Sequence, residues 1–363
     1  MLRKNEAKWI ESRRRWQINV QKEGVRRTFV STTAGVKGKI QAEKKADAWL
    51  AGQALDSSVR FDKLYRRYLE QIDLLGSHSN YVQKEQIGRI WLLPYLGRKK
   101  IGRITGQNWQ DCINAAYKAG RSKKTLSNIR GAMTDFARFV RRQGIAICPP
   151  DELIIPKNAA VGERHILQPD SIRTLFTQAD TLYRRCRQPD FYIYAYRFLV
   201  LTGLRRGELC GLKAADIQEP LISICRSVNR FGEMTEGKTK NARRQFVLSR
   251  AAVKVWHEQQ AHLRAHGIVS PWAFPDPDGD RLDSNTLYNR WDDYRTLHGL
   301  SCSLHELRHT FISLAQADAP ETLLKRAVGH SGSMDTFGVY GHTVDGEMQR
   351  LANILDHTFS QIL

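Results

Sequence analysis

The sequence predicts a multidomain, mainly α-helical protein with small β-sheets. Its 363 residues are enough for two or three domains. Apolar side chains recur at helical spacing between residues 61 and 140, whereas two short β-prone runs stand near the N-terminus. A Pro-rich stretch at 148–158 indicates a linker. We therefore predict a β-α module at 1–57, a helical bundle at 58–155 and a mixed α+β domain at 156–363.

The chain carries a strong excess of positive charge. It has 57 Lys and Arg against 37 Asp and Glu, a net charge of +20. Such an excess indicates a polyanionic partner, either nucleic acid or an anionic membrane surface. The longest apolar run, Tyr192–Leu201, is too short for a membrane span and contains Arg197. The N-terminus lacks an apolar signal core, so we expect a cytoplasmic protein that binds nucleic acid.

The positive charge is concentrated in the first two predicted domains. The net charge is +7 in residues 1–57, +10 in 58–155 and only +3 in 156–363. We therefore expect the first two domains to hold a long anion, and the third to carry the chemistry.

Cysteine and carboxylate patterns argue against a metal centre. The six cysteines form no C-x-x-C pair, and Cys302 near His305 lacks the second half of a zinc site. We expect reduced, mostly buried thiols. The chain has no paired carboxylates and no glycine-rich phosphate loop, which argues against a metal-dependent nuclease, and no cofactor is predicted.

The first 57 residues show a strand–turn–strand–helix pattern. Gln17 and Asn19 share one face of the first strand, and Arg26 and Thr28 share one face of the second. Such a sheet face can enter a DNA major groove and place side chains on base edges. The expected elements are strands at 16–20 and 26–30, a turn at Glu23-Gly24 and a helix at 42–54.

Residues 58–155 predict four helices with apolar stripes, three of which begin at polar residues. The second helix is expected to break at Pro94–Gly97. Two basic runs between helices are candidates for contact with DNA phosphates. They comprise Arg98, Lys99 and Lys100, and Arg121, Lys123 and Lys124.

The C-terminal domain combines helices, strands and a series of short motifs. Arg205 and Glu208 lie three residues apart, as do His305 and Arg308, so each pair shares a helix face. The cation and the imidazole of the second pair can converge on a phosphate. The motifs in chain order are Thr202-Gly203-Leu204-Arg205 with Glu208, Gly237-Lys238-Thr239-Lys240, His305-Glu306-Leu307-Arg308, Gly329-His330 and Tyr340. The expected elements are strands at 221–225 and 246–248, and helices at 192–201, 250–266 and 284–297.

In order and spacing, these motifs resemble those of the tyrosine recombinases, the phage and transposon integrase family. The resemblance covers the C-terminal domain closely and the first 155 residues in outline. It implies a lambda-integrase type of enzyme with an arm-type DNA-binding domain, a core-binding domain and a catalytic domain. It further implies site-specific cutting and rejoining of double-stranded DNA by a homo-tetramer, without ATP or metal, and accessory DNA-bending or excision proteins as candidate partners.

The resemblance also assigns roles to the motif residues. Attack on a phosphodiester requires neutralisation of the charge that builds on its oxygens. The nucleophile would form a 3′-phosphotyrosine and release a 5′-hydroxyl. Lys238 fits the family's register for the general acid, but Lys240 remains open because residues two apart on a strand face the same side. The implied roles are Tyr340 as nucleophile, Arg205 and Arg308 on the phosphate, His305 and His330 as hydrogen-bond donors or groups that move protons, and Glu208 as a brace.

Several alternatives stay open at this point. A type IB topoisomerase shares the Arg, His and Tyr chemistry, but the basic N-terminal module argues against it. A DNA-binding regulator with an inactive catalytic domain is disfavoured by the full residue set. The apolar stripe at 348–359 packs either on its own domain or on a neighbouring protomer. His309 and His342 are interpreted as structural residues.

Overall fold

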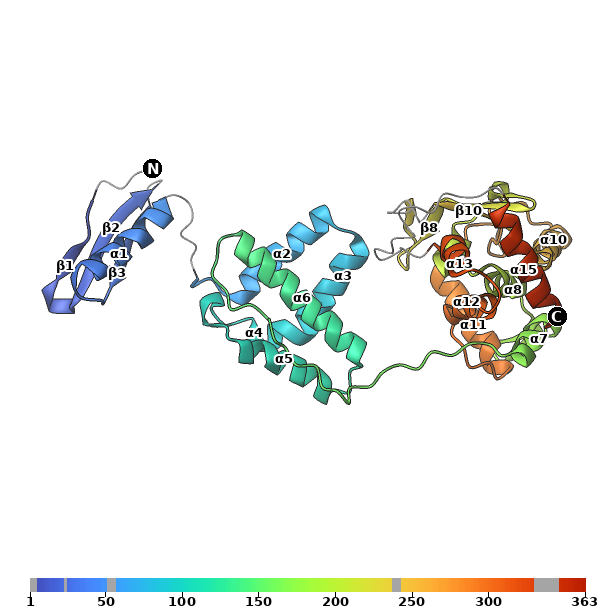
Figure 1. Cartoon of the computed structure of the whole chain (residues 1–363), viewed down its shortest axis with the longest axis horizontal. Coiled ribbons are helices and arrows are strands. Elements are labelled where there is room, and N and C mark those ends of the chain that lie inside the picture. The colour runs from blue at the N-terminus through green and yellow to red at the C-terminus, as the bar shows by residue number, and fades with distance from the viewer. Residues whose placement is uncertain (1–4, 23–24, 51–56, 237–242, 330–345) are drawn as a thin grey trace. The chain divides into compact units, whose positions relative to one another are not determined.

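The computed structural model of the chain divides into two compact units, residues 1–162 and 163–363, each of which is considered by itself (Figure 1). It describes residues 5–22, 25–50, 57–236, 243–329 and 346–363. Within these ranges no helix is both long and apolar enough to cross a membrane. The fold is mainly helical with small antiparallel sheets, as predicted.

The N-terminal module is a three-stranded antiparallel sheet covered on one face by a helix (Figure 1). Alternation along the central strand sends Ile18 and Val20 toward Ala42 and Ala46 of the helix, where all four are buried. The predicted strands are confirmed, and the helix begins seven residues earlier than position 42. The elements are β1 (Lys8–Ile10), η1 (Glu11–Arg13), β2 (Arg15–Lys22), β3 (Val25–Ser31) and α1 (Gly35–Leu50).

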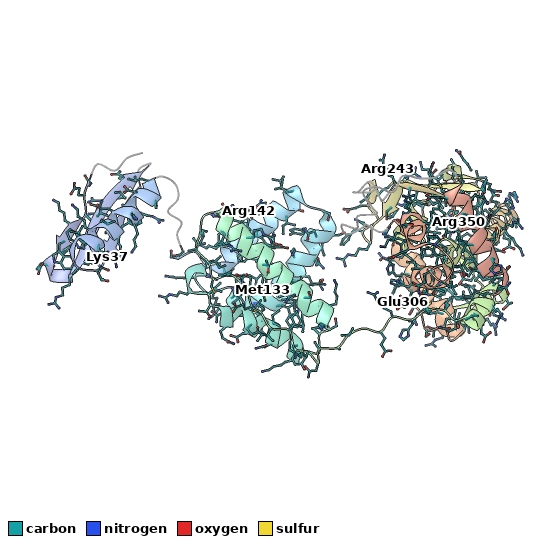
Figure 2. All side chains as sticks on the ribbon, viewed as in Figure 1. Lys37, Met133, Arg142, Arg243, Glu306 and Arg350 are labelled. Carbon is teal, nitrogen blue, oxygen red and sulfur yellow. The ribbon has the colours of Figure 1, made fainter. Side chains whose placement is uncertain are left out.

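The helical part of the first unit has its own apolar core, in which Met133 is fully buried (Figure 2). Phe61 lies against both Trp109 and Phe136, with ring centroids 5.9 and 4.7 Å apart. Thr105 and Ser122 accept hydrogen bonds from backbone N–H groups and so cap the last two helices. The elements are α2 (Phe61–Leu75), α3 (His78–Ile87), η2 (Gly88–Leu92), α4 (Leu93–Leu96), η3 (Ile101–Arg103), α5 (Gly106–Lys118) and α6 (Lys123–Arg142).

The break predicted at Pro94–Gly97 falls at Gly97 but not at Pro94, because the helix continues through Pro94 to Leu96. The segment η2 is a π-helix, and Pro94 stands at the start of the α4 that follows it, where a missing N–H is tolerated. Gly88 opens this segment in close contact with Tyr65. A Cβ at Gly88 would lie 2.1 Å from Cε1 of Tyr65, so only glycine allows the ring to pack there.

The Pro-rich stretch for which the sequence predicts a linker lies against the helical core along much of its length. The Gln110 side chain donates to the Ile154 carbonyl and accepts from the Ile154 N–H, both at 2.9 Å. Trp109 donates from Nε1 to the Cys148 carbonyl at 3.0 Å. Leu153 and Ala159 are buried in the same core. This strap therefore belongs to the first unit.

The second unit surrounds a buried central helix, α8, with helices and a three-stranded sheet ordered β10-β7-β6. Strands β7 and β10 and helices α10 and α11 confirm the predicted elements, whereas the β4–β5 hairpin was not predicted. The elements are α7 (Pro169–Thr177), β4 (Asp180–Tyr183), β5 (Cys186–Pro189), α8 (Ile193–Thr202), α9 (Arg206–Cys210), η4 (Ala214–Asp216), β6 (Ile217–Gln218), β7 (Leu221–Ile224), β8 (Arg226–Val228), β9 (Met234–Glu236), β10 (Arg244–Val247), α10 (Arg250–Ala265), α11 (Ser284–Leu297), α12 (Glu306–Ala315), α13 (Glu321–Val328) and α15 (Glu347–Ser360).

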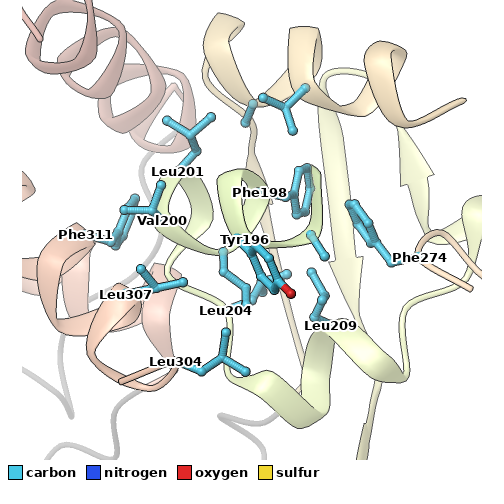
Figure 3. Packing of buried hydrophobic residues seen from close by; sticks show 14 of the residues in the cluster. Tyr196, Phe198, Val200, Leu201, Leu204, Leu209, Phe274, Leu304, Leu307 and Phe311 are labelled. Carbon is cyan, nitrogen blue, oxygen red and sulfur yellow. The ribbon is translucent and has the colours of Figure 1, made fainter. Parts of the chain in front are cut away.

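Helix α8 ends at Gly203, which directs the chain toward Arg205. Val200 of α8 lies near Leu307 and Phe311 of α12 (Figure 3). Gly203 adopts a left-handed conformation, with φ of +62°. A Cβ at this position would lie 2.4 Å from Cδ1 of Phe311, so glycine is required both by the backbone and by the packing.

The C-terminal helix α15 packs on its own unit. Leu351, Leu355 and Phe359 are buried in the central core, where α15 contacts α10, α12, α13 and β10. Of the two alternatives for the apolar stripe, the structure shows the intramolecular one.

Replacing Gly203 with Ala is expected to destabilise the second unit more than replacing Gly267, which follows α10 with φ of +68° and open space around it. Both substitutions place a Cβ on a left-handed residue, at about 1–2 kcal/mol. Only Gly203→Ala adds a clash with Phe311, which costs ~1–3 kcal/mol more. Urea denaturation of the full chain, with hydrogen exchange in α8 and α10, measures the difference. Equal losses would contradict the packing argument.

Candidate active site

Three arginines from separate segments meet at the C-terminal turn of α13. The last carbonyls of a helix have no partner within the helix, and its C-terminal end favours cations. Here three consecutive carbonyls each accept a hydrogen bond from a different guanidinium. The pairs are Arg244 Nε to Ala327 O (2.6 Å), Arg308 Nη2 to Val328 O (2.6 Å) and Arg205 Nη2 to Gly329 O (2.9 Å).

Local structure explains how these side chains reach the same turn. Gly329 ends α13 in a left-handed conformation, with φ of +64°. Arg205 is the residue that precedes α9, just after the turn at Gly203. Arg308 lies in the first turn of α12, and Arg244 begins β10. The start of α12 is held because Glu306 accepts from the backbone N–H groups of Ser303 (2.6 Å) and His165 (2.9 Å).

Glu208 joins two of the arginines. Its Oε1 accepts from Nη1 of Arg205 (2.8 Å) and Nη1 of Arg244 (2.9 Å), while its Oε2 accepts from the Arg205 backbone N–H and Arg244 Nη2, both at 2.8 Å. Only 5% of the Glu208 side chain is exposed. Burial by itself raises the pKa of Glu208, but the hydrogen bonds and charge of Arg244 and Arg205 outweigh it, so the pKa is lowered. The carboxylate is therefore ionised and fixed on both oxygens.

Arg308 is a buried cation beside the other two. It is 2% exposed and also donates from Nη1 to the Gly203 carbonyl at 2.7 Å. Burial, followed by the positive charge of Arg205, lowers the pKa of Arg308 to about 10. It stays protonated at neutral pH. In this cluster of described residues, three guanidiniums face one carboxylate, and the unbalanced positive charge suits an anion.

His305 stands directly before α12, one turn from Arg308, with its ring against that of His309 at a centroid distance of 5.1 Å. Partial burial lowers the pKa of His305, and the positive charges of His309, Arg308 and Arg205 lower it further. The ring is therefore neutral near pH 7 and can both donate and accept a hydrogen bond. His309, interpreted from the sequence as structural, is thus in contact with a candidate site residue.

The structure brings Arg205, Glu208, His305 and Arg308 together, as their motifs predict. Lys238, Lys240, His330, Tyr340 and His342 lie outside the described residues. Arg244 was not predicted as a site residue. A positively charged side chain on the strand after a lysine motif was the only available signal.

The candidate DNA-contact residues of the N-terminal module lie on one sheet face, opposite to α1. Asn19 pairs with Thr28 across the strands, and Thr28 Oγ1 donates to Asn19 Oδ1 at 2.7 Å. Gln21, which pairs with Arg26, and Lys8, which pairs with Gln17, share this face and were not predicted. Gln17 itself is held by Arg15, whose Nη2 donates to its Oε1 at 3.0 Å.

Both predicted basic runs of the helical bundle are exposed. Arg98, Lys99 and Lys100 form the turn between α4 and η3. Lys123 and Lys124 begin α6, while Arg121 lies over the Trp91 ring of η2 at 5.8 Å from its centroid. The second run is therefore linked to the π-helical segment that precedes the first.

Comparisons with known proteins identify the family of the chain. The model of the phage integrase family matches residues 165–347. The ICEBs1 integrase of Bacillus subtilis (strain 168) is 23% identical over 315 residues, covering 82% of this chain and 83% of its own length. The tyrosine recombinase XerC of Shewanella sp. (strain W3-18-1) is 24% identical over 317 residues, covering 84% and 96%.

Solved structures give the same fold. A Tn1549 transposon integrase in complex with transposon right end DNA has a TM-score of 0.65 at 20% identity, covering 81% of this chain and all of that one. A lambda integrase tetramer bound to a Holliday junction has a TM-score of 0.60 at 16% identity, covering 94% and 98%.

Fold, site and relatives together define a site-specific recombinase, an enzyme that breaks and rejoins DNA strands. The chain belongs to the phage integrase family, and the resemblance found in its sequence is confirmed. As a tyrosine recombinase it acts through a covalent phosphotyrosine. The comparisons give no support to a topoisomerase or to an inactive regulator.

His305 is expected to titrate below the ordinary histidine value of about 6.5. Because its folded-state pKa is lowered, the ring remains neutral until the pH falls below that value. His309→Gln removes one positive neighbour and should move the His305 midpoint upward. NMR titration of the ring resonances measures both midpoints. A His305 midpoint at or above the ordinary value would contradict the electrostatic account.

Proposed function

We propose that the arginine cluster around Glu208 binds the scissile phosphate of a crossover DNA site, and that Tyr340 attacks this phosphate. The observation that carries the proposal is the set of three guanidiniums, anchored on consecutive carbonyls, that face a single carboxylate. Attack by the phenolate forms a 3′-phosphotyrosine and breaks the bond to the 5′ oxygen. The 5′-hydroxyl of a partner strand then reverses the reaction and rejoins the DNA.

The described residues differ in what they contribute to this step. Arg205 keeps 38% of its side chain exposed, so it can bind a phosphate oxygen directly. Arg308 is buried behind it, and acts through its positive field on the charge that develops during attack. His305, neutral at pH 7, donates a hydrogen bond to a phosphate oxygen.

Residues outside the described ranges complete the proposed mechanism. His330 follows Gly329, whose carbonyl already holds Arg205. Lys238 is the proposed general acid that protonates the leaving 5′ oxygen, with Lys240 as the alternative. These roles rest on the order of the motifs in a chain that belongs to the phage integrase family.

We further propose that the first unit holds DNA at two kinds of site. The helical bundle, with its basic runs at 98–100 and 121–124, grips the core site. The polar sheet face around Asn19 and Thr28 reads an arm site. The structural relative that forms a tetramer on a Holliday junction supports a homo-tetramer as the working assembly. Accessory DNA-bending or excision proteins would set the direction of recombination.

Tyr340→Phe is expected to bind crossover DNA but never to become covalently attached, because only the attacking hydroxyl is removed. The substrate is a nicked duplex carrying the crossover sequence, identified by sequencing the DNA that flanks the gene. Tyr288→Phe, which removes another phenol from the same unit, is the matched control and should retain attachment. A covalent band from Tyr340→Phe on a denaturing gel would exclude Tyr340 as the nucleophile.

Cleavage of the same duplex is expected to proceed in excess EDTA and without any nucleotide. The ester bond energy is kept in the phosphotyrosine, and the arginines supply the positive charge that a metal would otherwise provide. Single-turnover cleavage with and without Mg²⁺ is the measurement. A strict requirement for Mg²⁺ would overturn this mechanism.

Arg26→Ala in the full chain is expected to abolish a discrete footprint on arm DNA, since Arg26 lies on the exposed sheet face. Lys44→Ala removes the same charge from the exposed side of α1 and should only weaken binding uniformly. Loss of one bidentate base contact is worth roughly 1–3 kcal/mol. Footprinting over the ends of the integrating DNA at near-physiological salt distinguishes the Arg26 variant from the Lys44 variant. Equal effects of both variants would show binding without sequence recognition.

A further inference from the structure

Arg244 belongs to the arginine cluster of the proposed mechanism but takes no individual step in it, and it makes the most complete set of contacts in the cluster. Its fork donates to both oxygens of Glu208, at 2.9 and 2.8 Å, and its Nε donates to the Ala327 carbonyl at 2.6 Å. Only 7% of its side chain is exposed. A buried side chain with these contacts cannot also serve as an open phosphate ligand.

We propose that Arg244 is a positioning residue for DNA cleavage, which holds Glu208 and the α13 turn so that Arg205 is directed at the scissile phosphate. This inference rests on the proposed function, since it concerns the phosphate that Arg205 binds. Arg244 acts through two routes, one by way of Glu208 and one by way of α13.

The first route is electrostatic. Glu208 carries one negative charge and shares it between Arg205 and Arg244. If Arg244 were absent, the nearest counter-ion of the buried carboxylate in the described part of the site would be Arg205 alone. Glu208 would then hold the Arg205 guanidinium more tightly and neutralise it, leaving less positive charge for the phosphate.

The second route is geometric. Ala327 O, which accepts from Arg244, is the first of the three consecutive carbonyls that anchor the arginines. Fixing Ala327 fixes the direction of the Val328 and Gly329 carbonyls that follow. Arg244 also lies six residues after Lys238, so the same side chain ties the start of β10 to the turn that precedes His330.

The second unit contains a comparable ion pair, Arg226–Asp216, which in the described residues makes no hydrogen bond to the side chains of the arginine cluster. Arg226 donates to Asp216 through Nη1 (2.5 Å) and Nη2 (3.4 Å), and its Nη1 also reaches the Gly211 carbonyl at 3.3 Å. Like that of Arg244, the Arg226 guanidinium donates both to the two oxygens of a carboxylate and to a backbone carbonyl. Arg226→Gln therefore measures the loss of a partly buried ion pair in the same unit that does not touch Arg205.

The experiment compares full-length wild type with Arg244→Gln, Arg244→Lys, Arg226→Gln and Arg205→Ala on the nicked crossover duplex. Two substrates are used, one with the natural scissile phosphate and one with a neutral methylphosphonate there. Single-turnover strand cleavage and DNA affinity are measured separately. If Arg244 acts through Arg205, Arg244→Gln should cleave the phosphate substrate about 10–10²-fold more slowly, somewhat less than the ~10²–10³ loss for a direct transition-state donor.

The DNA affinity of Arg244→Gln should equal that of wild type. Its loss of cleavage rate relative to wild type should be smaller on the methylphosphonate, because that substrate lacks the charge that the arginines neutralise. The rate deficit of Arg205→Ala should likewise be smaller on the methylphosphonate, whereas Arg226→Gln should cleave both substrates at the wild-type rate. Arg244→Lys keeps the charge but not the fork and should fall between wild type and Arg244→Gln. If thermal melting shows that Arg244→Gln does not fold, the Arg244→Lys variant is used in its place.

The positioning role is overturned if the Arg244 variants show the same deficit on both substrates, or match Arg226→Gln. A different outcome speaks against the proposed function itself. If wild type cleaves neither substrate, or if Arg205→Ala cleaves like wild type, the phosphate is not bound where we propose, whatever the Arg244 variants do.

Discussion

The C-terminal turn of α13 is the feature on which the site depends. Its three terminal carbonyls need donors, and each receives one from a different arginine: Arg205 just before α9, Arg308 in α12 and Arg244 in β10. Hydrogen bonds to charged groups contribute about 1.5–3 kcal/mol each, enough to fix side chains that approach from distant points of the sequence. Helix α13 is in turn held by α15 and β10. The position of one short helix therefore sets the spacing of all three guanidiniums.

Such a cluster is electrostatically costly until an anion arrives. Burial and neighbouring positive charge lower the pKa of Arg308 to about 10, which shows that its charged form is disfavoured there. Glu208 offsets only part of the repulsion. A phosphate offsets more, and a pentacoordinate phosphorus with greater charge on its oxygens offsets more still. In the proposed mechanism the site is therefore complementary to the transition state rather than to the resting phosphodiester, which is the condition for catalysis.

The features that could be predicted from the sequence are those set by the spacing of residues close together in the chain. The three-residue intervals of Arg205 with Glu208 and of His305 with Arg308 define a site because each pair shares a turn. Helices α10 and α11 and strands β7 and β10 follow equally from periodicity and end signals.

Other features depend on contacts between distant segments. The role of Arg244 becomes visible only when β10, α9 and α13 are seen together. The β4–β5 hairpin escaped prediction because Arg184 and Arg185 occupy its left-handed tip, where glycine or asparagine is the usual signal. Whether the stripe of α15 packs within its own unit depends on which surfaces the rest of the fold leaves uncovered.

The charges expected to set DNA affinity and those expected to act in DNA cleavage lie in different parts of the chain. Residues 1–155 contain 31 Lys and Arg against 14 Asp and Glu, whereas the remainder is nearly balanced. Each phosphate contact made by the exposed basic residues releases counterions, so binding by the first unit must weaken steeply with salt. The arginine cluster is largely buried and preformed by protein hydrogen bonds, and it is screened far less. DNA affinity and the rate of the bound complex should thus respond differently to ionic strength, because they arise from separate sets of charges.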